Sequence, residues 1–171
     1  LIMALSFLTS ADLSIDVVVT CDKEVMATSE QRKDYLADGD LDSLGEVGSN
    51  ATRFTLKALS PAEREEAEVR AGAYSRSELG RMLWVEAPSD SSDRARWHHG
   101  LSDDERVAMA DYQAYLSRVY VEMVRSSLTH IGGEEGGIDQ VNLIRPDSDR
   151  LVVMSELVSH IQRISLLGTE G

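Results

Sequence analysis

Three aspartates stand at alternate positions in one short segment, which reads Asp38-Gly39-Asp40-Leu41-Asp42. This spacing is typical of the start of a calcium-binding loop, because alternate carboxylates in a tight turn converge on one hard cation. The later positions depart from that pattern, since Ser43 stands where glycine makes the sharp turn and Ser49 where a bidentate glutamate belongs. The segment therefore favours a solvated acidic loop and leaves a bound cation open.

Histidine and cysteine side chains are the other candidates for chemistry. Adjacent residues of a helix or strand point in different directions, so His98 and His99 cannot hold one metal ion as an i, i+4 pair does. We expect His130 and His160 to cap helices or to lie on helix surfaces. The single cysteine, Cys21, excludes an intramolecular disulfide, and because it follows an apolar run we expect it to be a small buried residue.

Motifs that would indicate an enzyme are absent from the sequence. It contains no Gly-x-Ser-x-Gly nucleophile motif, no phosphate-binding glycine loop and no dinucleotide fingerprint. The glycine-rich segment 132–137 would place Glu134 and Glu135 against any phosphate that it approached. Pairs of carboxylates arise by chance in a chain with 30 acidic residues. We therefore expect a non-enzymatic protein with no catalytic residue, no metal and no cofactor.

Composition limits the classes of partner. The length of 171 residues, 42% of them apolar, fits a single domain spanning 1–171. Seventeen basic against thirty acidic side chains give a formal charge of −13, which repels phosphate backbones and anionic lipids and excludes nucleic acid as the main partner. No segment approaches the roughly 20 apolar residues that cross a bilayer, and residues 1–8 lack the basic start of a secretory signal. We expect a soluble, non-secreted protein.

Two strands are predicted in the first third of the chain. Residues 15–20 form a β-branched run, and residues 52–58 alternate between apolar and polar side chains. We expect both in one small sheet, and a third strand from 138–145 or from a partner stays open. The intervening segment 22–50 is far longer than an ordinary connection and rich in Asp, Gly and Ser. We expect an extended acidic arm, with a short helix near 30–36, that becomes ordered on a partner.

Capping signals and helical periodicity predict the remaining elements. Ser60-Pro61-Ala62-Glu63 predicts a surface helix that ends near residue 71, and a second helix is expected at 77–85. Segment 86–101 is expected to be a polar connection. The two best apolar stripes lie at 102–131 and 149–167, around Leu116 and Ile161, and we expect these helices to pack together as most of the core. The expected fold class is α+β, mainly α, with two long packed C-terminal helices, a small N-terminal β-sheet and a long acidic arm.

Three stretches of the chain have sequence patterns that are similar to those of one class of proteins. They are the amino-terminal β segment, the run Phe54-Thr55-Leu56-Lys57-Ala58-Leu59 leading into Ser60-Pro61-Ala62-Glu63-Arg64-Glu65, and the closing helix over 156–165. Together they resemble small virion or tail-assembly proteins of tailed bacteriophages, without a diagnostic motif. The resemblance implies a protein of the virion or host cytoplasm that binds copies of itself or other virion proteins.

Two other classes stay open beside this one. The acidic composition also fits an adaptor or inhibitor that places an acidic face in the basic groove of a partner. A small enzyme stays open as well, since residues far apart in a sequence can meet in a fold.

Overall fold

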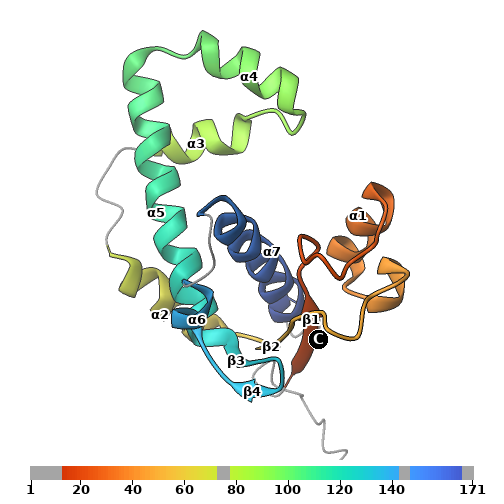
Figure 1. Cartoon of the computed structure of the whole chain (residues 1–171). Coiled ribbons are helices and arrows are strands. Elements are labelled where there is room, and N and C mark those ends of the chain that lie inside the picture. Colours follow the sequence, from red (N-terminus) through yellow and green to blue (C-terminus); the bar gives the residue numbers. More distant parts are fainter. Residues whose placement is uncertain (1–12, 73–77, 143–146, 167–171) are drawn as a thin grey trace, which may run out of the picture. The chain divides into compact units, whose positions relative to one another are not determined.

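The computed structural model describes residues 13–72, 78–142 and 147–166 (Figure 1). Helices predominate over one small antiparallel sheet, which confirms the α+β, mainly α, class predicted from the sequence. The chain forms two compact units. Unit 1 comprises Leu1–Ala67 with Tyr120–Gly171, and unit 2 comprises Glu68–Val119, so that the boundary falls inside helices α2 (Pro61–Ala71) and α5 (Asp103–Ser127).

The sheet belongs to unit 1 and has four strands in the spatial order of the sequence. They are β1 (Ser14–Val18), β2 (Arg53–Lys57), β3 (Leu128–Ile131) and β4 (Glu134–Glu135), and each neighbouring pair is antiparallel. Phe54 and Leu56 of β2 are buried, whereas the alternate residues face the other side of the sheet. Both predicted strands are present, and they pair directly, with Ile15 opposite Leu56.

Strand β3 was not expected, because its residues were assigned to the end of the helix at 102–131. Helix α5 ends at Ser127, four residues before Ile131. Gly132 and Gly133 adopt φ values of 63° and 86°, which allow the tight turn that joins β3 to β4. The backbone groups on the edge of β2 that faces away from β1 need hydrogen-bond partners. Strand β3 supplies them, so residues 128–131 form a strand although their spacing also fits a helix.

Segment 138–145 was a candidate for a further strand, and its start is helical instead. Helix α6 (Ile138–Val141) buries both of its end residues. Hydrogen bonds from the Gln140 amide to the Gly137 carbonyl and from the Asn142 amide to the Ile138 carbonyl, at 3.1 and 2.9 Å, close this turn in place of a strand ladder. Residues 143–145 lie outside the described part of the chain.

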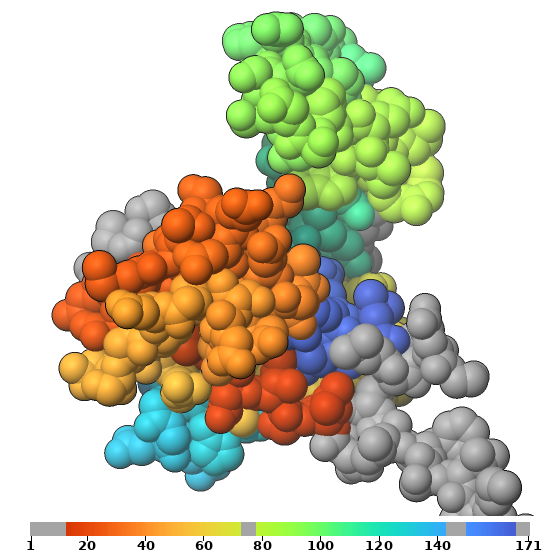
Figure 2. Space-filling model, turned by 90° about the vertical axis from the view of Figure 1, so that its right-hand side faces the viewer, coloured from red at the N-terminus to blue at the C-terminus, as the bar shows by residue number. Residues whose placement is uncertain are grey.

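Segment 22–50 is folded and is not an extended arm. It forms helix α1 (Ser29–Asp38), confirming the short helix expected there, and the 3-10 helix η2 (Leu41–Leu44). Its few apolar side chains gather in one buried cluster with Val18 of β1; the cluster contains Val25, Tyr35 and Leu44. Figure 2 shows the segment as a compact mass of orange atoms beside the blue helix α7 (Asp147–Leu166). The polar composition did not predict that this segment is packed, because its apolar residues are few but converge in one cluster.

Polar contacts also hold this segment in place. The Tyr35 hydroxyl accepts a hydrogen bond of 3.0 Å from the amide of Val18. At the end of α1, the Arg163 guanidinium of α7 donates to the carbonyl of Asp38 at 2.9 Å. Gly39, at φ 74°, makes this approach feasible, because a Cβ at that position would collide with the guanidinium.

Helix α7 supplies the central apolar face of unit 1. Its fully buried residues include Leu157, Ile161 and Ile164. It contacts β2, α1 and α6, so the core around it draws on more elements than the two long helices that were expected to form most of it. Leu116 of α5 is only half-buried, and Leu151 of α7, placed in the expected stripe, is exposed. Periodicity identifies an apolar face without saying which surface covers it.

The start of helix α2 follows the predicted capping box. The Ser60 amide donates to the Glu63 carboxylate at 2.8 Å, and the Glu63 amide donates to the Ser60 hydroxyl at 3.2 Å. Lys57 at the end of β2 also pairs with Glu63 at 2.7 Å. These hydrogen bonds hold the pKa of Glu63 below its usual value. The helix is mainly a surface helix, in agreement with its sequence, and buries Ala67 and Ala71.

Unit 2 contains helices α3 (Glu78–Glu86) and α4 (Ser91–Gly100) and the first part of α5. Its buried cluster consists of Leu83, Leu101 and Met109. Segment 86–101, expected to be a polar connection, is largely helix α4. The Asp90 carboxylate caps that helix by accepting from the amides of Ser92 and Asp93. No residue of α4 is buried, so the helix has no apolar stripe from which its sequence could have predicted it.

Candidate functional site

Two of the three aspartates of the calcium-like spacing, Asp38 and Asp40, accept hydrogen bonds through their carboxylates in the turn between α1 and η2. The Asp38 carboxylate accepts from the amide of Asp40 at 2.8 Å and from the hydroxyl of Ser43 at 2.9 Å. The Asp40 carboxylate accepts from the amide of Asp42 at 3.0 Å. The first two bonds lower the pKa of Asp38. Within the described ranges, no three His, Cys, Asp or Glu side chains are grouped to hold a metal ion.

The four histidines occupy separate places. His98 and His99 are exposed in the last turn of α4, where the helix dipole favours positive charge. His130 is exposed on β3, with its Nδ1 atom 3.0 Å from the Thr129 hydroxyl. His160 is fully buried on α7, so the expectation of a surface or capping role is wrong for this residue.

The surroundings of His160 fix its charge state. Its ring lies 4.9 Å from the ring of Tyr35, and its Nδ1 atom is 3.2 Å from the Arg163 guanidinium. Because arginine only donates, Nδ1 accepts and the ring proton is on Nε2, which has no hydrogen-bond partner among the described residues. Burial, assisted by the charge of Arg163, lowers the pKa of His160 to about 4. The imidazole is therefore neutral at physiological pH and serves the core.

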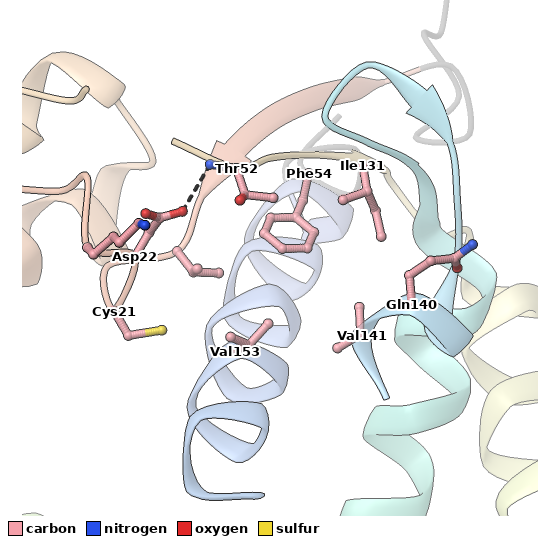
Figure 3. Close-up of a pocket in the computed structure, with 10 residues that line it drawn as sticks. Cys21, Asp22, Thr52, Phe54, Ile131, Gln140, Val141 and Val153 are labelled. Atoms are coloured by element: carbon pink, nitrogen blue, oxygen red, sulfur yellow. Dashed lines mark hydrogen bonds between the residues drawn. The ribbon is translucent and has the colours of Figure 1, made fainter. Parts of the chain in front are cut away.

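A pocket of about 350 Å³ in unit 1 is the clearest candidate site (Figure 3). It lies among the loop after β1, strands β2 and β3, and helices α6 and α7. Its apolar walls come from five residues: Val19, Phe54, Ile131, Val141 and Val153. Cys21, Asp22, Lys23, Thr52 and Gln140 provide its polar part. Such a lining, apolar with a few polar groups, is typical of binding sites.

Asp22 fixes the loop that forms one side of the pocket. Its carboxylate accepts from the amide of Glu24 and from the amide of Thr52, each at 2.9 Å, and so ties the loop to the start of β2 (Figure 3). Burial raises the pKa of this carboxyl, but the hydrogen bonds from these amides outweigh burial and the pKa is lowered. Asp22 is therefore ionised at physiological pH and helps to shape the pocket.

Cys21, expected to be buried, is exposed beside this carboxylate. It follows the end of β1, where the chain turns outward, so the apolar run before it does not extend burial to it. The lining holds one thiol and one carboxylate but no histidine, which is the base that usually activates a thiol. The arrangement is suited to holding an apolar group.

Sequence reasoning missed this pocket because its residues come from five separate segments. Cys21, the run 15–20 that contains Val19, and the buried positions of β2 had been singled out, each for a reason unrelated to a pocket. The alternation of β2 predicts that Phe54 is buried, but the neighbours of Phe54 depend on β3 and α6, which were not predicted.

A second feature lies on helix α3 of unit 2. Leu83 is buried, whereas Met82 and Val85 are 51% and 76% exposed. Met82 and Val85 are three residues apart and are therefore neighbours on the helix surface. The helix thus carries apolar side chains beyond the face that the cluster of unit 2 covers. Val107 of α5, at 58% exposure, is another large apolar side chain of unit 2 in contact with solvent.

Comparison with known proteins gives no match to a protein-family model, to a curated protein or to a solved structure. Across the described residues, the helices are too short or too polar to span a membrane.

Proposed function

We propose that this protein works by binding other proteins, as a structural or assembly component without enzymatic activity. The observation that carries this proposal is the exposed apolar surface of α3 formed by Met82 and Val85. Met82 and Val85 keep two neighbouring apolar side chains in contact with water, which is unfavourable. A protein partner that covers Met82 and Val85 removes this cost.

The size of the effect is enough to matter for binding. Full burial of one such side chain is worth about 1.5–3 kcal/mol, so the pair offers a few kcal/mol before the costs of association. That is an anchor for an interface and not a whole interface. Additional contacts are therefore required.

The kind of assembly follows from the resemblance to small virion and tail-assembly proteins of tailed bacteriophages. On this proposal the partners are copies of the chain itself or other virion proteins, in the virion or the host cytoplasm. The net charge of −13 supports protein partners over nucleic acid or anionic membranes.

An acidic adaptor or inhibitor is the second candidate, favoured by carboxylates on the surface of the α1–η2 segment. Asp34, Asp38 and Asp42 are exposed there, and Asp38 stays ionised because its pKa is lowered. A basic groove on a partner would complement this surface. Binding that weakens steeply as salt increases would favour this candidate, whereas an apolar contact through α3 is much less sensitive to salt.

We expect the Met82→Glu/Val85→Glu variant to lose the complexes that the wild-type protein forms, because two carboxylates cannot be buried in an apolar contact. Light scattering on the protein alone, and mixed with the proteins encoded beside it, measures the masses. Val69→Glu is the matched control, since Val69 is 73% exposed in unit 2 without an apolar neighbour of this kind on its helix. Wild-type protein that stays monomeric in every mixture, or complexes that survive in the double variant, would contradict the proposal.

A further inference from the structure

The pocket of unit 1 has room for one large side chain. Its volume of about 350 Å³ lies near the lower end of the roughly 300–1,000 Å³ typical of ligand sites. Phe54 and Val141 stand on different elements and face the same space (Figure 3). An aromatic or branched aliphatic group placed there contacts apolar atoms on several sides, which is how interface anchors are held.

The charge around the pocket selects among apolar ligands. The Asp22 carboxylate is fixed at the pocket by two backbone amides, and each of its oxygens can accept a further hydrogen bond. Lys23 also lines the pocket, is exposed, and its ammonium helps to lower the pKa of Asp22, so a ligand cation has to displace it from the carboxylate. The charge of −13 on the whole chain repels a ligand that carries a carboxylate or phosphate and attracts one that carries an ammonium or guanidinium.

We infer that this pocket receives an aromatic or branched aliphatic side chain of a partner protein, from a segment that places a lysine or arginine beside Asp22. The inference rests on the proposed function and adds the chemistry of the bound segment. The pocket supplies apolar contact, and Asp22 supplies the charge that distinguishes a basic segment from an acidic one.

Two small probes with the same apolar body test the inference without a partner protein. They are 4-phenylbutylamine, which is cationic, and 4-phenylbutyrate, which is anionic. In nuclear magnetic resonance titrations of the full chain, the amine should shift the amide signals of Thr52, Ile131 and Val141. It should bind about tenfold more tightly than the acid. Asp22→Asn should reduce this preference for the amine.

A variant that fills the pocket gives the matched comparison. Val153→Phe, on the pocket side of α7, should weaken binding of the amine about tenfold or more, because its ring occupies the same space. Leu151→Phe on the same helix is the control, since Leu151 is 65% exposed and does not line the pocket. Equal binding of the two probes, or amide shifts confined to residues outside the pocket, would overturn the inference.

The native thiol at the pocket provides a second readout should Val153→Phe fail to fold. Mixed disulfides are formed between Cys21 and either 2-phenylethanethiol or 2-mercaptoethanol, and intact mass follows their reduction by added thiol. The phenyl adduct should persist to about tenfold higher reductant, because the ring gains contacts in the pocket. Equal persistence of the two adducts would count against the inference.

Failure here is distinguishable from failure of the proposed function. If neither probe binds at the pocket while Met82→Glu/Val85→Glu still abolishes complexes, only the assignment of the pocket is lost. If the amine binds as expected but no complex forms under any condition, the pocket remains an apolar cation site and the assembly proposal fails.

Discussion

Replacing Ile161 by alanine is expected to lower the free energy of unfolding by about 2–5 kcal/mol. Ile161 is fully buried on α7, which contacts β2, α1 and α6. Its side chain is therefore in the core of unit 1. Removing its outer carbon atoms loses both the transfer free energy and the contacts around the cavity that remains. The midpoint of denaturant unfolding measures the change.

Leu151→Ala is the control for this substitution. Leu151 is on the same helix at 65% exposure, and the variant should change the free energy of unfolding by less than about 0.5 kcal/mol. Equal losses for the two variants would mean that α7 does not bury the face described for it.

Acidification from pH 6.5 to 4 is expected to reduce the stability of the protein by up to about 3 kcal/mol through His160 alone. The pKa of His160 is about 4 in the folded protein and about 6.5 in the unfolded chain. Below pH 6.5 His160 therefore binds a proton in the unfolded chain but not in the folded protein. The free energy of unfolding falls until the pH reaches the pKa of His160 in the folded protein. Above pH 6.5 this contribution is fully present.

The variant His160→Gln isolates this contribution, because its amide does not titrate and still offers an oxygen to Arg163. Carboxyls with lowered pKa, such as Asp22 and Glu63, also lose stabilisation as pH falls, and they do so equally in both proteins. Chemical denaturation at pH 7, 5.5 and 4.5 should therefore show a shallower decline in the variant. Parallel declines would contradict the assignment of the neutral imidazole.

The sequence predicts those parts of the fold that depend on local interactions. The capping box of Ser60 and Glu63 needs only four residues, and the alternation around Phe54 needs only one strand. Both predictions are confirmed. The pattern of α7 identifies Ile161 and Ile164 correctly, because burial recurs at helical spacing whatever covers the helix.

The parts that were missed depend on long-range contacts. Leu128 fits the apolar row of α5 as well as it fits a strand, and only the available edge of β2 selects the strand. Tyr35 belongs to a segment of polar composition, yet its contacts with Val18 and His160 order that segment. The candidate pocket has one predictable part and one that was missed. Phe54 was predicted to be buried, whereas Ile131 and Val141 belong to elements that were not predicted.

Oxidative footprinting of Met82 tests most directly the claim that α3 is a protein-binding surface. Met82 is 51% exposed in the isolated protein and should be oxidised readily. In the complex that the protein forms with itself or with the proteins encoded beside it, the account predicts strong protection of Met82. Met109, which is only 4% exposed, should react slowly in both states and serves as the internal reference. A Met82 side chain that is oxidised equally fast in the free and assembled protein would contradict the account.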